Sequence, residues 1–391
     1  MRQGWEYKKL GDVCTIERGG SPRPITDYIT DSPDGVNWIK IGDAKEGSKY
    51  ITSTKEKIKK EGVKKSRYVH KGDFILSNSM SFGRPYILDV DGCIHDGWLV
   101  IHDDNNVFIK DYLYYLLASP VMYAKFKQLA VGGVVNNLNS ALVRKVEIPI
   151  PNMTTQEVIV KELDKINKLI SLKKQQLADY DNLAQSIFYE MFGDPVVNEK
   201  GWEVKKLGEV CECITDGDHM PPPKSDTGIP FVTIGNVNKA SRQIDFDNTY
   251  FVPRDYFDNI PNIKKPRRGD VLYTVTGSYG IPIIINYDKE FCFQRHIGLL
   301  RPKDFMSPVF LCMWALNDRT KGQADMVATG IAQKTVSLKS LRNFAIILPP
   351  LPLQQLFAQR IELIEQQKAE IKSTIADLET LLASRMQYWF D

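Results

Sequence analysis

The sequence lacks the features of a membrane or secreted protein. No apolar run reaches the roughly 20 residues that a membrane-spanning helix needs, and the opening MRQGWEYKKLGDVC has no apolar core of a signal peptide. Because the chain is far longer than a disulfide-stapled domain, its few cysteines are expected to be small buried side chains. They are Cys14, Cys93, Cys211, Cys213, Cys292 and Cys312. We therefore expect a cytoplasmic protein.

Catalytic signatures are missing as well. The chain has no GxxxxGK[ST] or GxGxxG loop for nucleotides, no GxSxG elbow for a nucleophile and no Asn-Pro-Pro-Tyr segment. Its five histidines are His70, His95, His102, His219 and His296. They are scattered, and no cysteine pair completes a zinc site with them. We expect a chain that is no enzyme and that holds neither a metal nor a cofactor of its own.

Charge is nearly balanced overall but uneven along the chain. The formal net charge is only +3. Between Lys55 and Arg67, however, seven Lys or Arg stand against two Glu, and Lys264–Arg268 holds four basic residues in five positions. One such run is usually a solvated face, but two runs at related positions of a repeat favour contact with nucleic acid.

The chain contains an internal repeat of roughly 197 residues. GWEYKKLGDVC from Gly4 and GWEVKKLGEVC from Gly201 differ at only two positions. Further matches are WIKIGDA with FVTIGNV, SFGRP with SYGIP, LVRKVEIPIP with SLRNFAIILP, and Gln156 with Gln354. Each copy predicts short strands such as 74–76, 271–275 and 281–285, and short helices at 112–117 and 308–316. A repeat of this length indicates two copies of one globular unit.

A long helix follows each globular part. Apolar residues recur there every three or four positions, which is typical of a coiled coil. The residues expected to pair the helices are Leu163, Ile166, Ile170, Leu177 and Ile187 in the first helix, and Ile361, Ile364, Ile371, Ile375, Leu378 and Leu382 in the second. Lys173 breaks the first series, and Lys368 and Arg385 interrupt the second.

The linker between the copies favours antiparallel pairing of the two helices. Parallel helices would require the segment from Gly193 to Trp202 to recross about 50 Å of helix at 1.5 Å per residue, and nine residues reach only about 30 Å. Only a globular domain that itself spanned the gap would change this conclusion. The predicted class is α+β, with two similar mixed α/β domains in a pseudo-two-fold arrangement separated by two antiparallel coiled-coil helices. The predicted divisions are a first domain at 1–153, a helix at 154–193, a linker at 194–201, a second domain at 202–351 and a helix at 352–391.

The repeated motifs resemble those of the specificity subunit of type I restriction-modification enzymes. The resemblance rests on the GWE-KKLG openings, the KGD and RGD strand starts, and the segments GGVVNNLNSALVRKVEIPIP and TGIAQKTVSLKSLRNFAIILPPLPLQQ, each leading into a long helix. It implies two target-recognition domains that read the halves of a split double-stranded DNA site. It also implies two modification subunits that methylate adenine with S-adenosylmethionine, and restriction subunits that use ATP and magnesium.

Loop residues with donors and acceptors are the candidates for reading bases. In the first domain these are Ser21, Arg23, Asn78, Ser79, Ser81, Arg84, Asn136 and Asn137; in the second they are His219, Lys224, Thr276, Ser278, Tyr279, Gln294, Arg295, Gln333 and Lys334. The basic runs supply candidates for phosphate contacts, which position a protein without specifying sequence. These are Lys64, Lys65, Arg67, Lys264, Lys265, Arg267 and Arg268.

Two other interpretations remain open at this point. The chain could be an interaction scaffold with two ligand-binding modules on a coiled-coil strut and no nucleic acid, which the modest net charge favours. It could also be the detached recognition module of a single-chain restriction enzyme. The paired basic runs and the family motifs oppose the scaffold.

Overall fold

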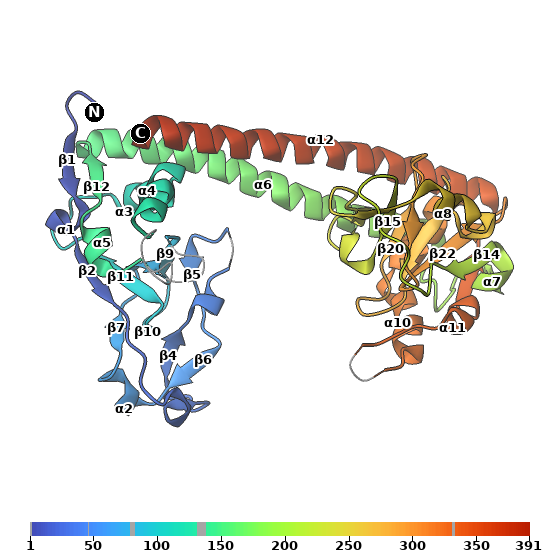
Figure 1. Cartoon of the computed structure of the whole chain (residues 1–391), viewed down its shortest axis with the longest axis horizontal. Coiled ribbons are helices and arrows are strands. Elements are labelled where there is room, and N and C mark those ends of the chain that lie inside the picture. The colour runs from blue at the N-terminus through green and yellow to red at the C-terminus, as the bar shows by residue number, and fades with distance from the viewer. Residues whose placement is uncertain (1, 46, 79–82, 131–137, 331–332) are drawn as a thin grey trace. The chain divides into compact units, whose positions relative to one another are not determined.

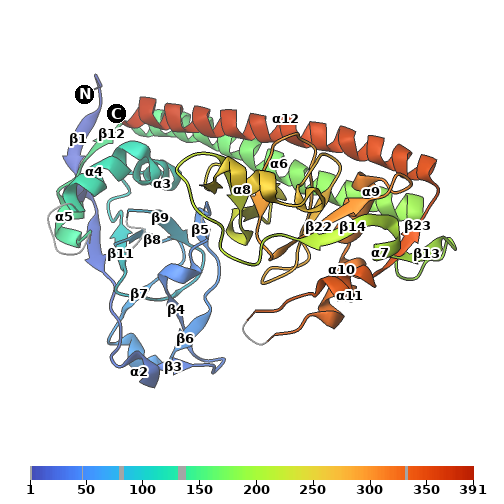
Figure 2. The same cartoon turned by 45° about the vertical axis from the view of Figure 1, so that its right-hand side comes forward.

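The computed structural model describes residues 2–45, 47–78, 83–130, 138–330 and 333–391. It consists of two compact units, which are treated separately below (Figures 1 and 2). The first unit comprises Met1–Lys174 and Ser373–Asp391, and the second comprises Gln175–Lys372. Within the described residues, no helix combines the length and the apolar character that crossing a membrane requires.

The first repeat forms a mixed domain of short strands and helices. Its strands are β1 (Glu6–Lys9), β2 (Thr15–Arg18), β3 (Ile29–Thr30), β4 (Val36–Ile39), β5 (Tyr50–Ile51), β6 (Glu56–Ile58), β7 (Arg67–Val69), β8 (Phe74–Ser77), β9 (Pro85–Leu88), β10 (Gly92–Ile94), β11 (Trp98–His102) and β12 (Glu147–Ile150). Its helices are α1 (Leu10–Val13), α2 (Lys60–Val63), α3 (Lys110–Ala118), α4 (Pro120–Ala130) and α5 (Ser140–Arg144). The strands form sheets of order β1-β12, β3-β6-β4-β10-β7 and β2-β11-β8-β9-β5.

The second repeat builds the same core from a different set of side chains. Its strands are β13 (Glu203–Lys206), β14 (Cys211–Asp216), β15 (Ile229–Val232), β16 (Val237–Asn238), β17 (Gln243–Ile244), β18 (Tyr250–Val252), β19 (Val271–Thr274), β20 (Pro282–Ile284), β21 (Cys292–Phe293), β22 (Ile297–Pro302) and β23 (Ala345–Leu348). Its helices are α7 (Leu207–Val210), α8 (Arg254–Asn259), α9 (Pro308–Leu316), α10 (Asp318–Val327) and α11 (Leu338–Arg342). The sheets have the orders β13-β23, β14-β22-β19-β20, β18-β15-β21 and β16-β17.

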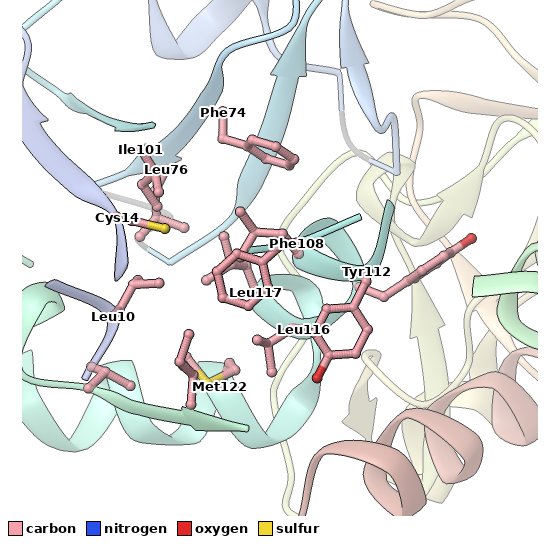
Figure 3. Close-up of a cluster of buried hydrophobic side chains, with 14 of the residues drawn as sticks. Leu10, Cys14, Phe74, Leu76, Ile101, Phe108, Tyr112, Leu116, Leu117 and Met122 are labelled. Carbon is pink, nitrogen blue, oxygen red and sulfur yellow. The ribbon is translucent and has the colours of Figure 1, made fainter. Parts of the chain in front are cut away.

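The core of each domain lies on both faces of one sheet. Along β8, Phe74 and Leu76 pack toward helices α3 and α4, while Ile75 packs toward the other sheet, as the period of two along a strand requires. Figure 3 shows Phe74 and Leu76 in one buried cluster with Leu116 of α3. In the second repeat Val271 and Tyr273 of β19 face the helices and Leu272 faces away. The sheet is therefore buried on both sides, so residues that contact a ligand must lie at its edges or in its turns.

Hydrogen bonds confirm that the repeat is structural. Gln156 accepts a bond from Ile109 N (2.8 Å) and donates to two carbonyl oxygens, at Val107 and Pro151. Gln354 makes the same three kinds of bond, with Ser307 N, Phe305 O and Pro349 O. These two glutamines, which the sequence comparison paired, fasten the first turn of each long helix to its own domain.

The Gly–Asp pairs before β8 and β19 also make matching turns. The Gly72 and Gly269 backbones have φ of +95° and +92°, a conformation that favours glycine. The Asp73 carboxylate accepts a bond from His70 N, and the Asp270 carboxylate accepts one from Arg267 N (2.8 and 2.9 Å). Each Gly–Asp pair thus forms a turn directly ahead of its strand, at the KGD and RGD strand starts of the sequence.

The two long helices pair antiparallel in each unit. α6 (Met153–Phe192) and α12 (Leu351–Phe390) are 40 residues each and run side by side (Figures 1 and 2). In the first unit Lys174 bonds Glu379 (2.8 Å) and Glu162 bonds Arg385. Residue numbers thus fall along α6 in the direction in which they rise along α12. In the second unit Asp181 bonds Lys368 (2.9 Å). The predicted antiparallel arrangement is confirmed.

Most residues predicted to pair the helices are buried. Seven are buried: Leu163, Ile166, Ile170, Ile361, Ile364, Ile371 and Ile375. Leu177, Ile187, Leu378 and Leu382 are half-buried. Lys368, which interrupted the predicted ladder, is itself buried, because Asp181 and Glu365 hold its ammonium group at 2.9 and 2.7 Å.

All six cysteines are free thiols, and the structure supports their assignment as packing residues. Four are buried, while Cys213 and Cys312 are partly exposed. Burial raises the pKa of Cys14, Cys211 and Cys292 to about 12, so these thiols stay protonated at neutral pH.

Candidate nucleic-acid interface

A tight turn before β11, and its counterpart before β22, lie at the centre of a cleft in each domain. In the turn 95–98, Trp98 N donates to His95 O (3.0 Å); in 294–297, Ile297 N donates to Gln294 O (3.1 Å). His95 N and Gln294 N each bond the end of the neighbouring sheet strand, at Ile39 O and Val232 O. The strand registers place Trp98 opposite Ser77 and Ile297 opposite Thr274. These are equivalent turns, although HDGW and QRHI share no residue.

The cleft of the first domain has Asp96 at its centre. The cleft measures about 410 Å³ and lies between the loop after β2 and the ends of β4 and β6. The carboxylate of Asp96 accepts a bond from Ser21 Oγ (2.9 Å), contacts His95 Nε2 (2.9 Å) and lies 3.6 Å from the Arg23 guanidinium. Because His95 Nδ1 accepts a bond from Gly97 N, Nε2 carries the proton and donates to Asp96.

The main chain of Asp96 is also held in place. Asn78 Nδ2 and Arg18 Nε donate to its carbonyl oxygen, both at 3.0 Å. Asn78 is only 3% exposed. This predicted base reader is therefore buried, and its amide group supports the main chain of the turn.

The cleft of the second domain gathers several predicted residues. It measures about 400 Å³ and is lined by His219, Thr276, Arg295 and Gln333 together with Asp216 and His296. His219 Nε2 lies 2.9 Å from Asp216, which orients its ring across the cleft. Burial and the neighbouring Arg295 lower the pKa of His296, so this imidazole is neutral at physiological pH.

Other predicted readers of the second domain lie outside the lining of that cleft. Lys224 stacks over the Tyr250 ring (4.9 Å), and Tyr279 donates its hydroxyl to Asp325 (2.7 Å). Gln294 bonds the His296 ring (2.6 Å) and so braces the turn. Ser278 and Lys334 contribute main-chain carbonyls to loop hydrogen bonds.

The remaining predicted readers belong to the first domain. Arg84 is exposed just before β9. Four positions lie outside the described residues: Ser79, Ser81, Asn136 and Asn137.

The predicted phosphate contacts are tied to nearby acceptors. Lys65 contacts the Tyr28 hydroxyl, and Arg67 pairs with Glu17 (2.8 Å). Lys264 and Lys265 donate to the main-chain oxygens of Gly217 and Asp258, while Arg267 pairs with Glu212 and Arg268 with Asp288 (3.0 and 2.8 Å). Lys64 is exposed at the end of α2.

The two basic runs are not at equivalent places. In the first domain the run ends α2 and begins β7, several residues before Gly72. In the second it begins at Lys264, the last residue of the short 3-10 helix Asn262–Lys264, and leads directly into Gly269. The pairing by sequence was wrong here, because His70 and Arg267 are the positions that make the same bond to the turn aspartate.

Both clefts are lined in part by polar side chains carried on loops. Across the residues that the structure describes, no cluster of three His, Cys, Asp or Glu side chains could hold a metal ion. The polar groups instead present donors and acceptors on loops that a rigid sheet positions, which is the arrangement of a binding site.

Two equivalent turns with different side chains, each lining a cleft in its own half of an internal repeat, define a two-domain recognition protein. A family model described as type I restriction modification DNA specificity domain matches the chain twice, over residues 2–179 and 199–380. Since the matches cover most of the sequence, the chain belongs to this family. It is therefore a DNA-specificity subunit of a type I restriction-modification system and is not itself an enzyme.

Relatives align with the chain along most of its length. The type I restriction enzyme MjaIX specificity subunit of Methanocaldococcus jannaschii is 24% identical over 383 residues, covering 92% of this chain and 86% of the relative. The EcoKI specificity subunit of Escherichia coli is 21% identical over 394 residues, covering 93% and 82%.

Solved structures share the fold. One, from work on complex assembly and conformational transition of the type I system, covers 99% of this chain and 97% of its own at 21% identity, with a TM-score of 0.63. The S subunit from M. genitalium covers 99% and 96% at 14% identity, with a TM-score of 0.50.

Proposed function

We propose that the chain reads a bipartite DNA target, with one half-site for each domain. The observation that carries this proposal is the pair of equivalent turns in clefts of unlike chemistry. The first presents a fixed carboxylate at Asp96, and the second presents a guanidinium at Arg295. Since hydrogen bonds to base edges specify sequence, the two half-sites should differ. Six predicted readers line the clefts and remain candidates for direct contact: Ser21, Arg23, His219, Thr276, Arg295 and Gln333.

The helix pair is proposed to set the spacer between the half-sites. Each helix holds 40 residues, or about 60 Å at 1.5 Å per residue. Gln156 and Gln354 fasten each helix to its own domain, so a change in helix length would be transmitted to the distance between the recognition surfaces. The predicted pseudo-two-fold relation of the domains belongs to this proposal.

The chain is also proposed to hold two copies of a modification subunit. Each unit exposes the same pair of apolar positions on its helices. These are Val158 and Leu381 in the first unit, and Leu356 and Leu183 in the second, at 54%, 45%, 44% and 45% exposure. Equivalent exposed apolar side chains in the two units suit two copies of one partner. The adenine methylation with S-adenosylmethionine would then take place in those partners, and restriction subunits would supply the ATP- and magnesium-dependent cleavage.

A selection experiment tests the proposal. The chain, copurified with modification subunits from the same host, is incubated with a randomised duplex library, and bound DNA is sequenced. We expect two short conserved blocks separated by a spacer of constant length and unconstrained sequence. Retention that is independent of sequence, or no retention beyond that of the modification subunits alone, would favour the interaction scaffold.

A further inference from the structure

The second position of the turn before β11 and β22 carries opposite charges in the two domains. Asp96 and Arg295 occupy it, as the shared turn bonds and strand registers require. Each lines its domain's cleft. We propose that this position reads a base in each half-site, an inference that rests on the proposed function. Asp96 accepts a hydrogen bond from the exocyclic amine of cytosine, and Arg295 donates to O6 and N7 of guanine.

The Asp96 carboxylate is oriented before any ligand arrives. Its Oδ1 accepts from Ser21 and His95, both at 2.9 Å, whereas Oδ2 has Arg23 at 3.6 Å, beyond hydrogen-bond distance. Oδ2 therefore retains acceptor capacity, and its side chain is 27% exposed. A carboxylate has only acceptors at neutral pH, so it matches the N4 amine of cytosine and repels the carbonyl oxygens of guanine and thymine.

Arg295 presents hydrogen-bond donors where Asp96 presents acceptors. Its main chain is fixed because its N–H donates to Asp218 O (3.0 Å). Its guanidinium is exposed and has no hydrogen bond or ion pair with any residue that the structure describes. A guanidinium has only donors, arranged in a fork that matches the two acceptors on the major-groove edge of guanine. Gln333, in the same cleft, supplies both donor and acceptor groups for a neighbouring base.

The proposal explains why equivalent turns share no residue. The backbone bonds of the turn are the same in both domains whichever side chain it carries, so the base preference can change while the fold does not. It predicts at least one G·C base pair in each half-site, read from the cytosine in one and from the guanine in the other.

The library selection is repeated with Asp96→Asn and Arg295→Gln in the full assembly. Asp96→Asn removes one charge at nearly constant shape, and Arg295→Gln replaces the charged guanidinium by a shorter neutral amide. Asp96→Asn should reduce the preference for its G·C pair by about 5- to 150-fold and leave the other half-site unchanged, and Arg295→Gln should do the same in the other half-site. Asp34→Asn and Lys239→Gln serve as controls, because they remove the same charges from exposed positions outside the cleft linings.

The intact half-site reports on folding within each variant. If both half-sites persist without any change in base preference, or if both variants alter the same half-site, the proposal is wrong while the bipartite function stands. If the unchanged chain selects no bipartite motif, the proposed function fails and this inference falls with it. Arg295 is exposed, so its replacement tests the idea even if Asp96→Asn unfolds the first domain.

Discussion

The last turn of each long helix packs into the domain built from the other repeat. Phe390, at the end of α12, is 3% exposed and stacks edge-on against Tyr112 of the first domain (5.7 Å between ring centroids). Phe192, at the end of α6, is fully buried against Phe310 and Phe357 of the second unit (4.8 and 5.1 Å). We expect truncation of each phenylalanine to weaken the unit that contains it, not the domain that precedes it in the sequence.

The magnitude follows from burial. Phe→Ala at a buried site costs about 3–5 kcal/mol through lost transfer free energy and the cavity left behind. A domain is typically stable by about 5–15 kcal/mol. Phe390→Ala should therefore raise the open population of the first unit by about 150-fold or more, since each 1.4 kcal/mol is about a factor of ten. Phe192→Ala should do the same for the second unit.

Hydrogen exchange measured by mass spectrometry checks this unit by unit. Phe390→Ala should speed exchange in β8 and β11 and leave β19 and β22 near the unchanged rate; Phe192→Ala should reverse the pattern. The exposed neighbours Gln387→Ala and Gln185→Ala are controls and should change neither. Faster exchange in β19 and β22 with Phe390→Ala alone would show that the helix ends do not complete the opposite domain.

Three further predictions concern charge and length. His102 lies 3.5 Å from Asp73, and the hydrogen bond between them raises the pKa of the imidazole above 6.5. Burial would raise the pKa of Asp73, but hydrogen bonds from His102 and from His70 N outweigh it and lower this pKa below 3.8. The pair should thus stabilise the first unit most between pH 3.8 and pH 6.5. Denaturation midpoints of the unchanged chain should fall as the pH rises above about 6.5, whereas those of His102→Gln should not show this fall. Lys368→Met should change stability by no more than about 1 kcal/mol, because its partner carboxylates are half exposed and can return to water, and ion pairs of exposed carboxylates contribute little; a loss of more than about 2 kcal/mol in urea unfolding would contradict this. Inserting four residues after Lys173 and four after Ile371 adds about one turn, roughly 5–6 Å, to each helix. This should lengthen the spacer by one base pair and leave both half-sites unchanged. An unaltered spacer in the sequenced sites would show that helix length does not set the spacer.

Features with strong local signals could be predicted from the sequence. The helix ladder, the glutamines at 156 and 354 and the Gly–Asp turns depend on side chains that act close to their own backbone. A short helix at 308–316 was predicted with the bounds that α9 has. These elements were enough to establish two repeats and antiparallel helices.

Features that depend on distant partners could not be predicted. The basic residues beside β7 and β19 looked free for phosphates, because the sequence does not show that Glu17 and Glu212 meet Arg67 and Arg267. Asp96 was missed, since only strand register, and no residue identity, aligns it with Arg295.

Lys368 shows the same limit within the helices. It was an interruption in a ladder of apolar residues, yet the structure buries it between two carboxylates. The carboxylate of Asp181 comes from the other helix, so the ladder in α12 alone could not reveal how the charge is satisfied.

Sequencing of N6-methyladenine across a genome tests the central claim most directly. A host that expresses the modification subunits is compared with and without this chain, and modified positions are mapped at single-base resolution. The account predicts methylation at one bipartite motif with unlike half-sites, present only when the chain is expressed. Methylation that is the same without the chain, or a single continuous motif that one domain alone can specify, would contradict it.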